Sequence, residues 1–326
     1  MGLVYHNGRF IPEEHIEKAN VQSDVLRTLR SFLDANEPGL VRFLVNTWRS
    51  QGNAITYKEL REAILSGDIN SDLLDEWMQD YNRFVVKYLQ PAWERAIVAA
   101  ALAIEKKYPL WNFDPMGAGV LEWTATHAAE FVTNVTATQI EGLRAVVRRA
   151  AVLEDMTVDG LSRAIRPMVG LYKGQAEANL KYYETLIKNG MSEKKALDKS
   201  IRYAARQHRY RAYNIARTEL AFAYNQGSYE GTKQAQEAGY IGEVVKVWVT
   251  ALDERTCPTC SGLEGMRIAM DEDFPFNTKL EGRNATIKKV PPAHPSCRCA
   301  VMYEEISPPV YQKSKESNSK IQNTVV

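Results

Sequence analysis

Five side chains that commonly bind metal ions lie within a short stretch near the C-terminal end of the sequence. Cys257 and Cys260 form a Cys-x-x-Cys motif, and His294, Cys297 and Cys299 follow in the segment His-Pro-Ser-Cys-Arg-Cys. Thiolates and imidazoles are the usual ligands of tetrahedral zinc, and a Cys-x-x-Cys loop brings two thiolates to one ion. The spacing therefore predicts a structural zinc site. Its expected ligands are Cys257, Cys260, His294 and one of Cys297 and Cys299.

Two other interpretations of the cysteines stay open, namely reduced thiols without a metal and one or two disulfides. All 4 cysteines lie between Cys257 and Cys299. A protein stapled by disulfides usually spreads its cysteines over the whole fold, so this clustering favours a local metal site. The stretch from Ser261 to Ala293 is longer than the loop of most zinc ribbons, which argues against the simplest ribbon. A metal here would supply folding free energy to a short module that has little core of its own.

The sequence contains none of the common catalytic motifs. His-Glu-x-x-His does not occur among the 5 histidines, and we expect His127 to be an ordinary residue of a helix. Gly117-Ala118-Gly119 has no third glycine, so we expect a transition from a loop to a helix there. No Gly-x-Ser-x-Gly motif is present. The sequence thus predicts a protein without enzymatic activity.

A stripe of basic residues precedes the cysteines. Between Asp198 and Glu219 the chain has several cations and no acidic residue. On a helix most of these arginines share one face, with Tyr213 among them, and such a face suits phosphates or an acidic protein surface. The alternative is a solvated helix face, or one that pairs with acidic residues of a neighbouring subunit. The candidate contact residues are Arg202, Arg206, Arg209, Arg211 and Arg217.

The charge balance limits the role of such a stripe. The 41 lysines and arginines nearly cancel the 40 aspartates and glutamates, so any affinity for nucleic acid must come from a local patch. The apolar fraction of 45% is typical of a packed globular chain. The longest run without a charged residue has 10 residues, whereas a membrane-spanning helix needs about 20 apolar ones. We therefore expect no membrane segment, and the first residues do not have the pattern of a secretory signal.

The region that must position these residues is predicted to be almost entirely helical from Glu13 to Gly239. Thr56 and Glu59 have the spacing of a capping box at a helix start, and Thr138 with Glu141 repeats this spacing. Pro91 is expected to end or kink a helix that begins at Asp72. Gly190 followed by Ser192 predicts that one helix stops and the next one starts there.

After residue 239 the pattern changes to short strands separated by loops rich in Gly, Pro and Asp. Strands are predicted at residues 244–250, 266–269, 286–290 and 300–303, because β-branched and aromatic residues concentrate there. The polar segment 307–326 is predicted to be a disordered tail. The fold class is therefore α+β, a long helical region followed by a small module with antiparallel strands. The predicted divisions are 1–197, 198–306 and 307–326.

An ordered series of motifs in the last third of the chain resembles a known family. The series comprises Ile-Ala-Arg217-Thr-Glu219-Leu with Asn225 and Gly227, the segment Trp-Val-Thr-Ala-Leu-Asp253-Glu-Arg255-Thr-Cys-Pro-x-Cys, then Leu-Glu-Gly265, and finally Pro-Pro-Ala-His-Pro-Ser-Cys-Arg-Cys. Taken together, these motifs resemble the phage head morphogenesis family typified by the F protein of phage Mu, the minor head proteins of tailed phages. The resemblance covers about residues 202–305.

The resemblance implies a non-enzymatic minor capsid protein of the virion. Such a protein would be found in the head interior or at the portal vertex, and in the host cytoplasm during assembly. Its implied partners are the portal protein, major capsid or scaffold proteins and, for some members, double-stranded DNA.

A structural latch is expected where the last long helix meets the strand module. Arg217 and Glu219 point to different sides of a helix, and we expect one of them to pair with the loop of Asp253 and Arg255.

Two alternatives to the head protein are a small metal-dependent endonuclease, in which the cysteines hold a ββα-like site, and a zinc ribbon that binds nucleic acid. An endonuclease needs a second histidine, but His294 is the only histidine after residue 239. A nucleic-acid-binding ribbon would be more basic than this module.

Overall fold

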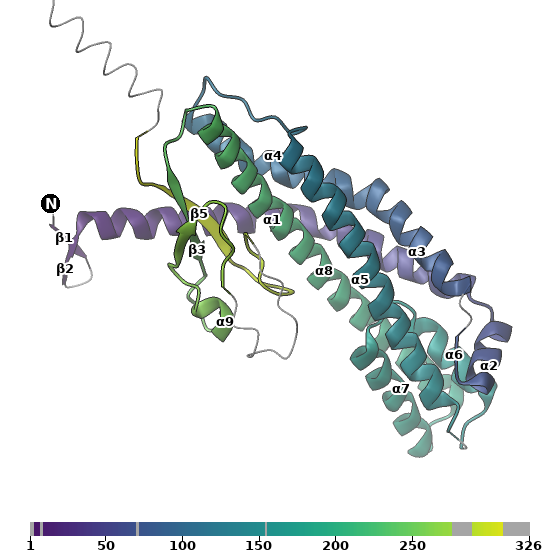
Figure 1. Cartoon of the computed structure of the whole chain (residues 1–326). Coiled ribbons are helices and arrows are strands. Elements are labelled where there is room, and N and C mark those ends of the chain that lie inside the picture. Colours follow the sequence, from purple (N-terminus) through teal and green to yellow (C-terminus); the bar gives the residue numbers. More distant parts are fainter. Residues whose placement is uncertain (1–2, 7–8, 70–71, 154, 276–288, 309–326) are drawn as a thin grey trace, which may run out of the picture. The chain divides into compact units, whose positions relative to one another are not determined.

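The computed structural model describes residues 3–6, 9–69, 72–153, 155–275 and 289–308 (Figure 1). The chain forms two compact units, each of which draws on separate stretches of sequence. The first, which we call the sheet unit, contains Met1–Asn36, Ala92–Leu121 and Arg217–Val326. The second, which we call the helical unit, contains Glu37–Pro91 and Glu122–Ala216.

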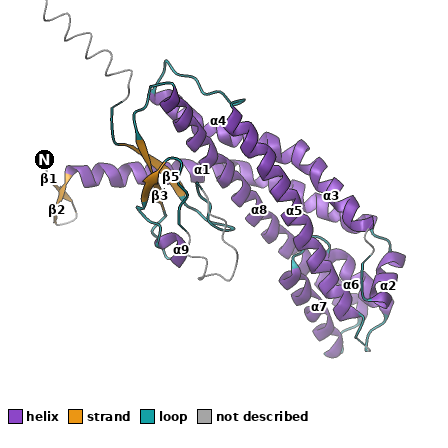
Figure 2. Cartoon of the chain, viewed as in Figure 1, coloured by secondary structure: helices purple, strands orange, loops and turns teal. Residues whose placement is uncertain are grey.

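Helices make up most of the described chain, and short strands occur at its start and near its end (Figure 2). The helices are α1 (Glu13–Ala54), α2 (Tyr57–Ser66), α3 (Asp72–Phe84), α4 (Gln90–Lys107), α5 (Ala118–Ala150), α6 (Val158–Ile165), α7 (Lys173–Lys188), α8 (Glu193–Glu237) and α9 (Pro258–Ser261). The strands are β1 (Leu3–His6), β2 (Arg9–Pro12), β3 (Val244–Val249), β4 (Arg267–Ala269) and β5 (Ala300–Glu305). The predicted α+β class is confirmed, while the β1–β2 pair was not predicted.

The predicted boundary between residues 197 and 198 lies inside α8, which runs without interruption from Glu193 to Glu237. No loop marks a division at that point, and the boundary stays a prediction. The predicted tail begins at residue 307, and residues 309–326 lie outside the described part of the chain. Among the described residues, no helix has both the length and the apolar composition that crossing a bilayer requires.

The two predicted capping boxes have different outcomes. At Thr56 the prediction is confirmed, because the Glu59 N–H donates to Thr56 Oγ1 (3.2 Å) and the Thr56 N–H donates to Glu59 Oε2 (2.7 Å). At Thr138 the predicted helix start is wrong, since this residue lies in the middle of α5. Its hydroxyl donates to the Asn134 carbonyl (2.9 Å), one turn back, as threonines inside helices commonly do.

Pro91 disturbs its helix without ending it. The residues before it, Val85–Leu89, form a π-helical turn between α3 and α4, and the Gln90 N–H donates to the Val85 carbonyl. A proline lacks an N–H group and its ring collides with the carbonyl four residues earlier in a regular α-helix. The wider turn accommodates both effects, so the chain continues directly into α4. The predicted stop and start at Gly190 is confirmed between α7 and α8, where Gly190 has a φ of 79°.

The helical unit is built around an apolar core to which α2, α5, α6, α7 and α8 contribute. A bidentate ion pair joins α5 to α7, with Arg149 donating to the two carboxylate oxygens of Glu184 at 2.7 and 2.8 Å. A buried polar network lies beside this core. In it the Trp48 indole N–H donates to the Tyr81 hydroxyl (2.8 Å), which donates to Gln139.

The sheet unit contains an antiparallel sheet of order β4-β3-β5. In its register Val247 pairs with Met302, and Trp248 pairs with Val301. Because side chains alternate between the two faces of a strand, Val247, Val249 and Met302 share one face and pack against Val25 and Leu26 of α1.

The opposite face of the sheet carries Trp248, Val301 and Tyr303. Val301 and Tyr303 pack on Tyr229 of α8, while Trp248 packs among the cysteines. The predicted strands 244–250, 266–269 and 300–303 are confirmed as β3, β4 and β5. Most of the predicted strand 286–290 lies outside the described residues, and Val290 itself is not in a strand.

Candidate metal centre

The Cys-x-x-Cys motif lies on the loop that follows β3 and on the one-turn helix α9. Cys257 is the N-cap residue of this turn, and its sulfur accepts the Cys260 N–H at 3.3 Å. Pro258 occupies the first helical position, where the missing N–H costs nothing. This local structure brings both thiols to the same side of the loop, as the motif predicts.

The second half of the site is the segment before β5. The Cys297 N–H donates to the His294 carbonyl (3.1 Å), which closes a tight turn, and Ser296 within it has a φ of 61°. The Ser296 N–H donates to Thr218 Oγ1 of α8 at 3.0 Å, so this helix supports the turn. The His294 Nδ1–H donates to the Pro295 carbonyl (2.9 Å), which leaves Nε2 free to face the sulfurs.

The five predicted ligands come together as two triads that share Cys260. One triad is Cys257, Cys260 and His294, and the other is Cys260, Cys297 and Cys299. Nε2 of His294 lies 3.0 Å from the Cys257 sulfur and 3.3 Å from the Cys260 sulfur, and the Cys260 and Cys297 sulfurs are 3.6 Å apart. Ligands around one tetrahedral zinc ion are about 3.5 Å apart, given bonds of about 2.0–2.3 Å. This donor set can therefore hold a metal ion.

The electrostatics of the cluster favour one ionised thiol beside a protonatable imidazole. Hydrogen bonds from Cys260 and then Cys299 hold the pKa of the Cys297 thiol well below its usual range, while hydrogen bonds with Cys297 and then Cys299 raise the pKa of Cys260. Burial lowers the pKa of His294, but the neighbouring Cys297 thiolate and the Pro295 carbonyl outweigh this effect, so its pKa is raised. Negative charge thus concentrates where a cation would be bound.

The surroundings of the cluster are closed and largely apolar. Trp248, Leu263 and Phe274 pack around the sulfurs, and the Trp248 and Phe274 rings meet edge to face with centroids 5.0 Å apart. The cavity among the ligands has a volume of about 30 Å³, which is room for a single ion or water molecule and not for a substrate.

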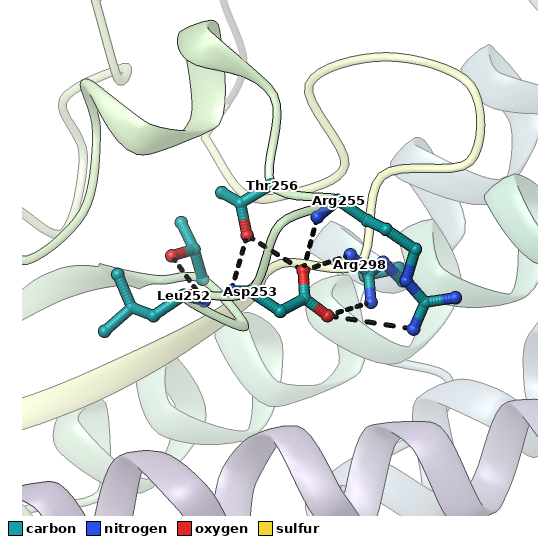
Figure 3. A network of polar contacts seen from close by, with 6 residues as sticks. Leu252, Asp253, Arg255, Thr256 and Arg298 are labelled. Carbon is teal, nitrogen blue, oxygen red and sulfur yellow. Dashed lines mark hydrogen bonds and ion pairs between the residues drawn. The ribbon is translucent and has the colours of Figure 1, made fainter.

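The predicted latch has a partner that the sequence analysis did not include. Arg298, which lies between two of the cysteines, donates to both carboxylate oxygens of Asp253 at 2.6 and 2.7 Å (Figure 3). Arg255 is the more distant partner of Asp253, at 3.7 Å. Arg217 and Glu219 are partly buried on α8, and their pairing with this loop stays a prediction. The alternation Cys-Arg-Cys could have indicated that Arg298 has a partner outside the cluster, because an arginine between two buried ligands must point to another side.

The structure separates the predicted basic stripe into exposed and buried members. Arg202, Arg206 and Arg209 are exposed. Arg211 is only 7% exposed, and its guanidinium donates to the Gly170 carbonyl (2.6 Å) and to Thr138 Oγ1 (2.8 Å).

Arg211 is therefore a packing residue of the helical unit and is not available to a phosphate, which corrects the prediction for this residue. Its guanidinium also lies over the Trp48 ring, 5.2 Å from the centroid. Helical spacing could have indicated this burial, because Arg211 follows Ala204 by seven residues, or two turns, and both lie on the buried face of α8. Arg217 is partly buried and belongs to the sheet unit.

One residue of the family motif was given no structural role in the sequence analysis. Asn225 of α8 is 1% exposed and accepts the Val301 N–H of β5 at 3.0 Å through its Oδ1 atom. Its amide also donates to the Ala221 carbonyl (2.9 Å) and to the Cys299 carbonyl (3.5 Å). Asn225 thus joins α8 to the edge strand next to the last two cysteines.

The fold and the site define a mostly helical protein with a small sheet module organised around a cysteine and histidine cluster. Residues 180–302 match the family described as Phage Mu protein F like protein. The resemblance is confirmed for this part of the chain, which is similar to that family. It extends from α7 into β5 and contains all five candidate ligands. No curated protein and no solved structure shows a significant match to the chain.

The family indicates a role in phage head morphogenesis. The similarity of residues 180–302 to this family suggests association with the virion and interaction with other phage head proteins.

Proposed function

We propose that the protein is a non-enzymatic minor capsid protein that binds the portal, and that zinc staples its C-terminal module. The observation that carries this proposal is the convergence of the five donors, because it joins segments that are far apart in the sequence. The loop after β3 and the turn before β5 meet at the sulfurs. Thr218 of α8 holds the same turn through Ser296.

Zinc in this position would act as a structural element. The expected ligands are Cys257, Cys260, His294 and Cys297, because the 3.6 Å between the Cys260 and Cys297 sulfurs suits one tetrahedron. Cys299 is the alternative fourth ligand. Structural zinc contributes about 10–16 kcal/mol to the folding of small zinc domains, and here it would add to the support that the sheet receives from α1 and α8.

The geometry of His294 supports a role without catalysis. Its Nδ1 atom is used by the Pro295 carbonyl and its Nε2 atom faces two sulfurs, so neither nitrogen is left to activate a water molecule. A hydrolytic metal site keeps an open coordination position, whereas this cavity has room for the ion alone. These features favour a staple over the endonuclease alternative.

The exposed arginines of α8 are the proposed contact with an acidic portal surface or with packaged DNA. Arg206 lies over the Tyr203 ring, 5.7 Å from its centroid, and Tyr210 nearby is 63% exposed. Guanidinium groups next to exposed aromatic rings suit both phosphates and carboxylates. Arg202 and Arg209 are exposed on the same stretch of α8.

Elemental analysis of the purified protein, combined with thiol titration, tests the zinc proposal. About one zinc per chain is expected, and its removal by a chelator should lower the melting temperature. A sample with four titratable thiols and no metal would contradict the proposal.

Portal binding is tested separately by size-exclusion chromatography with the portal protein of the same phage, at low and high salt. Absence of a complex at both salt concentrations would rule out the portal association.

A further inference from the structure

Lys246 is a fully enclosed lysine (0% exposed) in β3, the middle strand of the sheet. A lysine is almost never buried to this degree unless its charge has partners, because an ammonium group is costly to remove from water. Burial lowers the pKa of Lys246 to about 8, so the side chain is still mostly a cation at pH 7. An apolar residue would fill this position at lower cost, and the buried charge therefore calls for a role.

Two main-chain carbonyls and two aromatic rings surround the ammonium group of Lys246. Its Nζ atom donates to the Glu272 carbonyl (2.6 Å) and to the Lys289 carbonyl (3.0 Å), two contacts that we call the carbonyl clamp. The same atom lies 5.5 Å from the centroids of the Tyr229 and Phe274 rings, within the range of cation–π attraction. Two carbonyls cannot hydrogen-bond to each other, so a buried donor is needed to hold these two segments together.

Both clamped segments lead into the candidate metal centre. The next buried residue after Glu272 is Phe274, which packs among the buried cysteines. Lys289 precedes the buried residues 290–292, which lead to His294. Two of these three residues are prolines, whose fixed φ makes the connection stiff, so the position of the Lys289 carbonyl bears on the position of the imidazole.

The carbonyl clamp and the metal centre share one face of the sheet. Because side chains alternate along a strand, Lys246 and Trp248 point to the same side of β3. Trp248 packs among the cysteines, and its ring meets the ring of Phe274 edge to face. Phe274 thus contacts both the ammonium group and the apolar wall of the metal centre.

We propose that Lys246 is a positioning residue of the metal centre, which clamps the segment of His294 so that the imidazole meets the thiolates in the geometry that zinc requires. This inference rests on the proposed zinc site, and it identifies a residue outside the five donors on which zinc affinity depends. Residues that orient metal ligands typically change the affinity about 10–100-fold when they are replaced.

Zinc affinity of the full chain at pH 7, measured by competition with a chromogenic chelator, tests this role. Lys246→Met keeps the length of the side chain but loses the donor, so it should bind zinc about 10–100-fold more weakly. Lys246→Arg can still donate to both carbonyls and should lose less. Lys233→Met is the matched control, because Lys233 is an exposed lysine of the same unit, and its zinc affinity should equal that of the wild type.

A double-mutant cycle with His294→Ala separates positioning from a general loss of stability. The four cysteines remain in His294→Ala and should still bind zinc, although more weakly. If Lys246 acts through His294, adding Lys246→Met to this variant should lower the affinity no further. Circular dichroism checks the folding of each variant, and Lys246→Arg replaces Lys246→Met in the cycle if the latter does not fold.

Two results would overturn the positioning role and leave the zinc site intact. One is an affinity of Lys246→Met equal to that of the wild type. The other is a loss in the double variant that equals the sum of the two single losses on a free-energy scale. A wild-type protein that binds no zinc would overturn the zinc site itself and the role of Lys246 with it.

Discussion

Arg298 and Asp253 form a bidentate ion pair, with nitrogen–oxygen distances of 2.6 and 2.7 Å between residues that are 45 positions apart. The pair connects the loop after β3 with the segment that carries Cys297 and Cys299. Both side chains are largely enclosed, with 17% and 27% of their surfaces exposed. Planar guanidinium and carboxylate groups fit each other in this geometry, which fixes the orientation of both segments.

Replacing Arg298 by lysine should weaken this connection, because a lysine cannot make both hydrogen bonds. We expect a lower melting temperature for Arg298→Lys, and Arg267→Lys provides a control at the exposed pair with Glu304.

The guanidinium of Arg298 holds the pKa of Asp253 well below its usual value of 3.8. The stabilisation is therefore present above about pH 4 and is lost as the pH falls further. Thermal melts between pH 3 and 7 check this, and parallel curves for wild type and variant would contradict it.

Cys260 belongs to both triads, so its loss should affect the metal more than the loss of Cys299. We expect Cys260→Ser to abolish zinc binding and Cys299→Ser to retain at least part of it, because the four expected ligands Cys257, Cys260, His294 and Cys297 all remain in the second variant. Zinc content by elemental analysis after dialysis measures the difference. Equal zinc contents in the two variants would show that the centre is not organised around Cys260.

Gly227 allows α8 to approach α4 closely within the sheet unit. A Cβ atom at this position would collide with the backbone Cα and carbonyl oxygen of Ile97, which cannot move without shifting the helix. Gly227→Ala should thus destabilise the protein by about 1–3 kcal/mol, as overpacked cores do.

Gly39 of α1 is the control for this substitution, since a Cβ atom there meets no atom within 4 Å. Gly39→Ala should raise the stability by about 0.5–1 kcal/mol through helix propensity. Urea unfolding measures both changes. A stability gain in Gly227→Ala would contradict the close packing of the two helices.

His208 should make the helical unit sensitive to acid. Burial lowers its pKa to about 4, and its Nε2–H donates to the Val169 carbonyl at 2.8 Å. Because the unfolded state takes up a proton near pH 6.5 and the folded state only near pH 4, stability should fall between these values by up to about 3 kcal/mol. His208→Gln should flatten this part of the pH profile, as measured by urea unfolding. An unchanged profile would show that other groups cause the acid sensitivity.

Local features of the sequence were sufficient to predict most elements. The capping box at Thr56 and the break at Gly190 depend on interactions between residues close in the chain. The three strands pair over long sequence distances, but each was predicted from the β-branched and aromatic residues of its own segment. The same holds for the metal centre, because cysteine and histidine have few alternative roles and their spacing restricts how they can meet. Thr138 shows the limit of such reasoning, since its motif also fits a helix interior.

The tertiary structure decided the roles of the arginines. Arg211 and Arg209 are chemically equivalent in the sequence, but the packing of α8 buries the first and leaves the second in solvent. Arg298 finds Asp253 only because the sheet brings the two loops together. The pairing of a long charged side chain depends on which surfaces fold against each other, and that information is spread over the whole chain. The residue types of the candidate metal centre are local information, so the sequence by itself determined them.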